Sequence, residues 1–158
     1  MKRVLLGVGN RLSHDDAVGP MVAEGLTGAP GWISVDCGTA LENACGLVAR
    51  ESPDLLVVVD AALMGLTPGA IRRIPLRARD RMLASTHGLP IAFVWERFAS
   101  TVGRTVLLGI EPADLSFGEG LSPAVAAAVE RLGVQLRAAD IDSIPEHDAD
   151  GPNKAKTP

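Results

Sequence analysis

Aromatic residues and positive charge are scarce in this sequence. Tyrosine is absent, aromatic residues make up 3% of the chain, and the formal net charge is −4 at pH 7. A nucleic-acid-binding surface needs a basic face or aromatic rings on which bases can stack. The composition therefore argues against nucleic acid as a partner.

Cysteine and long apolar runs are also scarce. The two cysteines, Cys37 and Cys45, form neither a disulfide framework nor a CxxC metal pair, so we expect free thiols. No apolar run approaches the length of a membrane span. The opening MKRVLLGVGN is interrupted by polar residues too early for a signal peptide. We therefore expect a cytoplasmic protein, and a monomer, because no large exposed apolar stripe is evident.

What the chain does contain is a regular alternation of strand and helix patterns. Its 158 residues, 47% of them hydrophobic, are enough for one domain with a substantial core. The expected strands are 3–8, 32–36, 54–60, 70–74 and 105–110. The expected helices are 18–26, 39–50, 89–100 and 123–136. This order predicts an α/β fold, a three-layer α/β/α sandwich around a mostly parallel twisted sheet of about five strands.

Three details of this arrangement are specific enough to test. The strand at 70–74 has no crossover helix before it, which favours an antiparallel pairing. Thr39 and Glu42 have the spacing of a capping box at the start of the second helix. The domain is expected to span 1–139, and the acidic, proline-punctuated segment 140–158 to be a disordered tail.

The stretch VLLGVGNRLSHDDAVG, residues 4–19, connects the first strand to the first helix through a glycine-rich turn and two adjacent carboxylates, Asp15 and Asp16. Open α/β sheets bind their ligands where parallel strands end. A dinucleotide fingerprint would read GxGxxG, but GVGNRL lacks the third glycine. Two carboxylates beside the turn would also repel a phosphate, so the nucleotide interpretation is disfavoured.

Aspartates follow or end three of the predicted parallel strands: Asp16, Asp36 and Asp60. Each one alone is explained by helix or turn capping. If the strands are neighbours, however, the three converge on one sheet edge, where His87 can join them. Two carboxylates and one imidazole form an O,O,N set that suits a borderline divalent metal and leaves positions open. A structural zinc site usually has four ligands, so we expect a metal that arrives with another molecule.

A thiol nucleophile is the competing chemistry. It would pair Cys37 with His87, but Asp36 beside the cysteine disfavours the thiolate. We therefore expect Cys37 to be a structural thiol.

Five motifs in this order resemble those of the [NiFe]-hydrogenase maturation endopeptidases. They are LLGVGNRLSHDDAVGP, VDCGTALEN, LLVVVDAALMGLTPGAIRRI, STHGLP and LLGIEPADLSFGEGLSP. The resemblance runs from residue 1 to about residue 136, and the STHGLP and TALEN versions are most similar to the branch that serves formate-hydrogenlyase-type hydrogenases.

The resemblance implies an endopeptidase that removes the C-terminal extension of a hydrogenase large-subunit precursor after nickel insertion. By motif, the nickel contacts fall on Asp16, Asp60 and His87, and a role in recognition or activity falls on Asp36. The candidate catalytic residues are therefore Asp16, Asp36 and Asp60. The nickel belongs to the precursor, and no organic cofactor is implied. The alternative is a non-catalytic nickel-sensing maturation chaperone of the same fold.

The sequence departs from the family pattern at two positions. Cys37 replaces a glycine in the family's DGGT segment, and it would be strained if that position needs a positive φ. Asp16 stands where some members have glutamate, so its carboxylate reaches one methylene less far.

Overall fold

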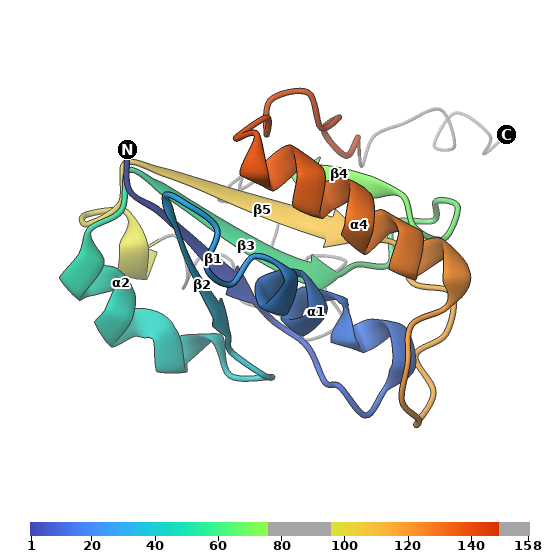
Figure 1. Ribbon diagram of the computed structural model, residues 1–158. Helices are drawn as coiled ribbons and strands as arrows, with labels where there is room; N and C mark the ends of the chain where they lie inside the picture. Colours follow the sequence, from blue (N-terminus) through green and yellow to red (C-terminus); the bar gives the residue numbers. More distant parts are fainter. Residues whose placement is uncertain (76–95, 149–158) are drawn as a thin grey trace, which may run out of the picture.

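The chain folds around a five-stranded sheet with strand order β2-β1-β3-β5-β4 (Figure 1). The computed structural model describes residues 1–75 and 96–148. The strands are β1 (Arg3–Gly7), β2 (Trp32–Asp36), β3 (Leu55–Ala61), β4 (Ile71–Ile74) and β5 (Arg104–Ile110). The first three strands and β5 are parallel, and β4 runs antiparallel to β5. The predicted fold class and the predicted direction of the 70–74 strand are both confirmed.

Strand β3 lies at the centre of the sheet because its sequence is apolar on both faces. All seven of its residues are buried, and β1 and β5 pair with it on either side. A strand that is covered on both faces reads as a continuous apolar run, which is what LLVVVDA provides.

Helices cover both faces of the sheet and complete the three layers. Helices α1 (Val18–Gly25) and α4 (Pro123–Arg137) lie side by side on one face (Figure 1). The 3₁₀ helix η2 (Leu41–Ala44) and α2 (Cys45–Glu51) pack on the other face, together with Phe98. Within the described ranges, no helix combines the length and apolar character needed to cross a membrane.

The second helix starts later than the capping box predicts. Helix α2 begins at Cys45, and no side chain caps either α2 or the η2 turn before it. The preceding turn is held by the first loop, since the Gly9 N–H donates to the Gly38 carbonyl at 2.8 Å. Thr39 therefore belongs to this turn and does not cap the helix.

The segment after α4 packs on the domain, so the prediction of disorder from residue 140 is wrong for its first part. Ile141 and Ile144 are each 2% exposed and join the core on the α1/α4 face. The Arg73 N–H donates to the Pro145 carbonyl at 2.8 Å, and the His147 N–H donates to the Arg73 carbonyl at 2.7 Å. Two isolated isoleucines gave too little periodicity to reveal this packing. Residues 149–158 lie outside the described ranges.

Candidate functional site

The carboxyl ends of β1, β2 and β3 meet at one edge of the sheet. Gly7 of β1 is in register with Asp36 of β2 on one side and with Val59 of β3 on the other. Asp60 is therefore only one residue beyond the level of Asp36. The sequence prediction that both aspartates reach the same edge is confirmed.

The glycines of the first loop allow backbone to approach backbone. A Cβ on Gly7 would collide with the carbonyl oxygen of Gly19, and a Cβ on Gly9 would collide with that of Asp16. These glycines bring the 3₁₀ helix η1 (His14–Ala17) and the start of α1 against the end of β1. Close backbone packing thus explains these glycines without a role in binding phosphate.

Asp16 lies in η1 and is 6% exposed. Its Oδ2 accepts a hydrogen bond from the Asn10 N–H at 2.9 Å. Because η1 packs against β3, this carboxylate is held at the edge of the sheet beside the strand that ends near Asp60.

Asp60 is the next-to-last residue of β3 and is 1% exposed. Strand alternation places it on the same face of the sheet as Val58, toward the α2 layer. Another buried carboxylate, Glu111, follows the neighbouring strand β5 and accepts the Met64 N–H at 2.6 Å. Sequence analysis missed Glu111, whose partner lies in the loop after β3.

Asp36 is exposed, unlike Asp16 and Asp60, and it points to the sheet face opposite that of Asp60. It shares that face with Trp32, and its side chain is 38% exposed. Its Oδ2 accepts a hydrogen bond from the Nε of Arg11 at 3.1 Å and forms an ion pair with Nη2 at 3.1 Å. Its Oδ1 accepts the Gly38 N–H at 2.8 Å. Arg11 also contacts Glu24 at 3.1 Å.

The three predicted aspartates therefore reach one edge without forming one cluster. Among the described residues, no three His, Cys, Asp or Glu side chains lie close enough together to hold a metal ion. The predicted ligand His87 lies outside the described residues, so the O,O,N set of Asp16, Asp60 and His87 remains a prediction.

Asp15 is the buried carboxylate that sequence analysis left without a role. It is fully buried, and its two oxygens accept four hydrogen bonds of 2.7–2.9 Å from the loop before α4. The donors are the N–H groups of Ala113, Asp114 and Ser122 and the Ser122 hydroxyl. Burial alone would raise the pKa of Asp15, but these hydrogen bonds outweigh it and lower the pKa below its ordinary value.

The environment of Cys37 agrees with the prediction of a structural thiol. Burial, and secondarily the negative charge of Asp36, raises the pKa of Cys37 to about 11, so the thiol is protonated at neutral pH. The expected backbone strain is absent. The positive φ of the turn, 54°, falls on Gly38.

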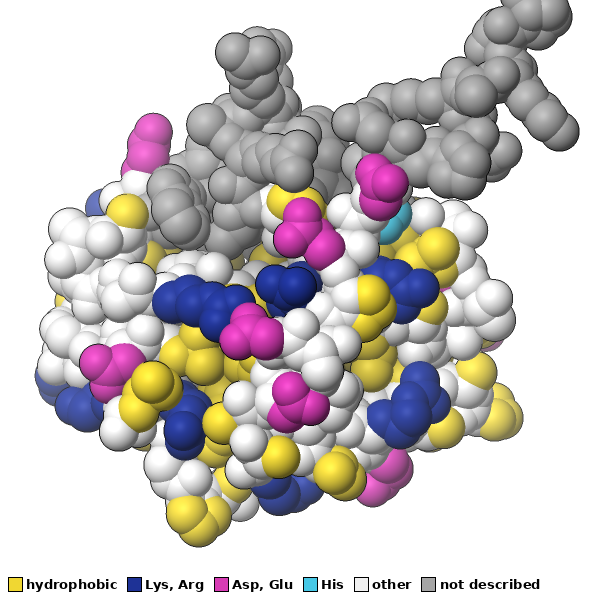
Figure 2. Space-filling view, turned by 90° about the horizontal axis from the view of Figure 1, so that it is seen from above, with side chains coloured by type: hydrophobic (Ala, Val, Ile, Leu, Met, Phe, Trp, Pro, Cys, Tyr) yellow, Lys and Arg dark blue, Asp and Glu magenta, His cyan; other side chains and the backbone are white. Residues whose placement is uncertain are grey.

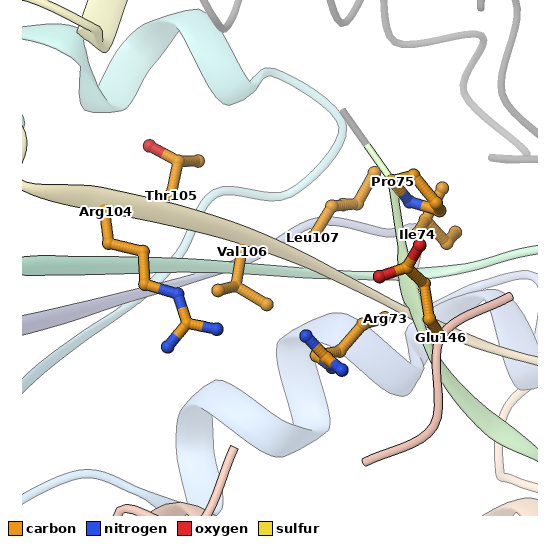
Figure 3. Close-up of a pocket in the computed structure, with 8 residues that line it drawn as sticks. All are labelled: Arg73, Ile74, Pro75, Arg104, Thr105, Val106, Leu107 and Glu146. Carbon is orange, nitrogen blue, oxygen red and sulfur yellow. The ribbon is translucent and has the colours of Figure 1, made fainter. Parts of the chain in front are cut away.

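A hollow of about 250 Å³ lies elsewhere, along the open side of β5 (Figure 3). Its lining includes Arg73, Arg104 and Glu146. Arg104 starts β5, five residues before the Gly109 that pairs with Asp60, which corresponds to about 17 Å along a strand. The hollow thus begins at the far end of β5 and follows the strand to Leu107, two residues before Gly109.

Charge on the face seen in Figure 2 is mixed. Lys and Arg side chains are interspersed there with Asp and Glu, with no continuous basic stripe.

Comparison with known proteins gives consistent matches over most of the chain. The family model described as "Hydrogenase maturation protease" matches residues 23–137. The hydrogenase 3 maturation protease of Escherichia coli K12 is 35% identical over 139 residues, which cover 86% of this chain and 89% of that protein. The hydrogenase 2 maturation protease of the same strain is 30% identical over 162 residues, covering 92% and 96%.

Solved structures show the same likeness. The solution structure of the endopeptidase HycI from E. coli superposes with a TM-score of 0.84 at 31% identity, covering 95% of this chain and 99% of that one. The [NiFe] hydrogenase maturation protease HycI from Thermococcus kodakarensis KOD1 gives 0.74 at 32% identity, covering 88% and 92%. This chain therefore belongs to the hydrogenase maturation proteases, a family of endopeptidases.

Proposed function

We propose that this protein removes the C-terminal extension of a [NiFe]-hydrogenase large-subunit precursor after nickel has been inserted. Family membership supports the class of reaction and of substrate. The observation on this chain that best supports the proposal is a pair of buried carboxylates, Asp16 and Asp60. They lie on η1 and β3, which pack together at the carboxyl edge of the sheet.

These two carboxylates are suited to contact the nickel of the substrate. Carboxylate oxygens, together with an imidazole from His87, make a ligand set for a borderline divalent metal. The set is incomplete by itself, so the remaining positions belong to the precursor. Such an enzyme binds the nickel-loaded precursor more tightly than the nickel-free precursor. Nickel held there positions or polarises the scissile carbonyl or a water molecule.

The hydrogen bonds of Asp36 favour a supporting role over proton transfer. Both of its oxygens are engaged, one by the Gly38 N–H and the other by Arg11. A general base needs an oxygen within reach of the proton that it removes. We therefore assign the base to Asp16 or Asp60 and a role in recognition to Asp36.

The test is cleavage of nickel-loaded precursor, followed by intact-mass spectrometry. Asp16→Asn and Asp60→Asn remove one charge each with little change of shape, and we expect each to slow cleavage at least about 100-fold. Asp142→Asn is the matched control, because that exposed carboxylate pairs with Arg104 at the far end of β5. It should cleave at the wild-type rate.

Two outcomes would contradict the proposal. Undiminished cleavage by Asp16→Asn would remove this residue from the site. Tight binding of the precursor by the wild-type protein without any loss of mass would favour the nickel-sensing chaperone.

A further inference from the structure

A pocket of about 300 Å³ lies between the first loop and the loop before α4. Its lining is Arg11, Ala17, Met21 and the segment 119–121. These residues come from two stretches about 100 positions apart in the sequence, which lie side by side in the fold (Figure 1).

The pocket adjoins the elements that carry the candidate catalytic groups. Ala17 directly follows Asp16 in η1. Arg11 also lines the pocket, and its guanidinium forms an ion pair with the carboxylate of Asp36. The pocket is therefore lined by a chain neighbour of Asp16 and by the ion-pair partner of Asp36.

The wall formed by the loop before α4 is fixed before any substrate arrives. Asp15 accepts four hydrogen bonds from this loop. The backbones of the two loops also pair, since the His14 N–H donates to the Gly118 carbonyl at 2.9 Å and the Gly118 N–H donates to the Leu12 carbonyl at 2.8 Å. A rigid wall lowers the entropy cost of binding.

The pocket lining combines aliphatic side chains with two charged ones, Arg11 and Glu119. Ala17, Met21 and Leu121 contribute aliphatic surface to the lining. The two loops also carry Leu12, 47% exposed, and Phe117, 85% exposed.

We propose that this pocket is a subsite for one aliphatic side chain of the precursor segment that flanks the scissile bond. The inference rests on the proposed function, because it takes the precursor as the bound molecule. A volume of about 300 Å³ is at the lower limit for ligand pockets, so it suits a single side chain. The residues Met21 and Leu121 then determine which side chain is accepted, and Asp15 keeps the wall in position.

The experiment changes the size of the pocket and of the substrate together. Met21→Phe narrows the pocket and Leu121→Ala enlarges it, while Val134→Phe places a phenylalanine on the exposed face of α4 as a control. The substrates are nickel-loaded precursors in which one of the two residues that flank the cleaved bond is replaced by alanine or by phenylalanine. Both kcat/KM and the precursor dissociation constant are measured.

We expect Met21→Phe to lower kcat/KM about tenfold with the unchanged precursor, mainly through KM. An alanine at one flanking position should restore most of this loss, and Leu121→Ala should accept phenylalanine at the same position better than wild type. Val134→Phe should match wild type. Rescue by a smaller substrate residue separates a subsite from a folding defect, which no substrate change would correct.

The outcomes distinguish the subsite from the proposed function. If wild type cuts the precursor but Met21→Phe cuts and binds equally well, the subsite assignment is wrong and the function stands. If wild type does not cut, the proposed function fails. The dissociation constants then test the subsite alone. Met21→Phe should bind the unchanged precursor about tenfold more weakly than wild type does, and the precursor with alanine should restore the affinity.

Discussion

The loop before α4 and the turn after β2 both reach the edge of the sheet that carries the candidate site, but they are held there in different ways. The loop before α4 is fixed by Asp15, which is fully buried and accepts four hydrogen bonds. The turn after β2 is held by Asp36, which is 38% exposed and pairs with Arg11 at the surface. The turn after β2 also has the backbone hydrogen bond from Gly9 to Gly38. We infer that the first wall is the more rigid one and that the second is the more adjustable one.

The difference follows from the surroundings of the two carboxylates. A hydrogen bond to a charged group contributes roughly 1.5–3 kcal/mol to stability. A buried donor that loses its acceptor destabilises the fold by its full desolvation penalty. An exposed ion pair contributes roughly 0–1 kcal/mol and is screened by salt. We infer that the rigid wall sets the geometry of the pocket and that the adjustable wall accommodates the bound precursor.

Removal of Asp15 should cause the largest loss of stability among the changes considered. Asp15→Ala leaves four donors of the loop before α4 without their acceptor, so we expect the free energy of unfolding to fall by about 3 kcal/mol or more. Asp36→Ala is the matched carboxylate removal on the adjustable wall and should cost less than about 1 kcal/mol. Urea unfolding measures both. Equal losses in the two variants would contradict the difference in rigidity.

The second largest effect is expected from low pH, which should weaken the hydrogen bonds that Asp15 accepts. The pKa of Asp15 in the folded protein lies below its ordinary value of 3.8. Its contribution to stability is therefore complete well above pH 3.8 and is lost as the pH falls through the folded-state pKa. Asp15→Asn cannot show this loss. Wild type should thus lose more stability than Asp15→Asn between pH 6 and pH 2, and parallel pH profiles in urea unfolding would argue against the assigned hydrogen bonds.

The smallest effect should come from the Arg11–Asp36 pair. A double-mutant cycle with Arg11→Gln and Asp36→Asn should give a coupling energy of roughly 0.2–1 kcal/mol at low salt. At 1 M salt, where the Debye length is about 3 Å, the coupling should shrink toward zero. A coupling that exceeds about 2 kcal/mol, or one that does not respond to salt, would show that this wall is as rigid as the other.

The sequence predicted the sheet well because its strands carry strong local signals. The apolar runs around Val57 and Leu108 are long enough to identify buried parallel strands, and the strand bounds agree to within one or two residues. Parallel neighbours place Asp36 and Asp60 at one edge as a matter of topology. Local signals were insufficient where a contact is distant in the chain, as for Ile141 and Ile144, which pack on the core after α4.

The candidate site was predictable in its residues but less so in its geometry. Asp36 and Asp60 end their strands at nearly the same level, yet a shift of one residue along a strand reverses the face to which a side chain points. The role of Asp15 was hidden because its partners are mostly backbone N–H groups about 100 residues later, which no residue type reveals. Cys37 replaces one glycine of the family pattern without strain because the next residue, Gly38, takes the positive φ.

Intact-mass analysis of matched precursors tests the central claim most directly. The wild-type protein is incubated with nickel-loaded and nickel-free forms of the same large-subunit precursor, and the mass of each is followed over time. Because Asp16 and Asp60 are proposed to contact the nickel of the substrate, only the loaded form should lose its C-terminal extension. Equal cleavage of both forms, or the absence of cleavage in either, would contradict the proposal.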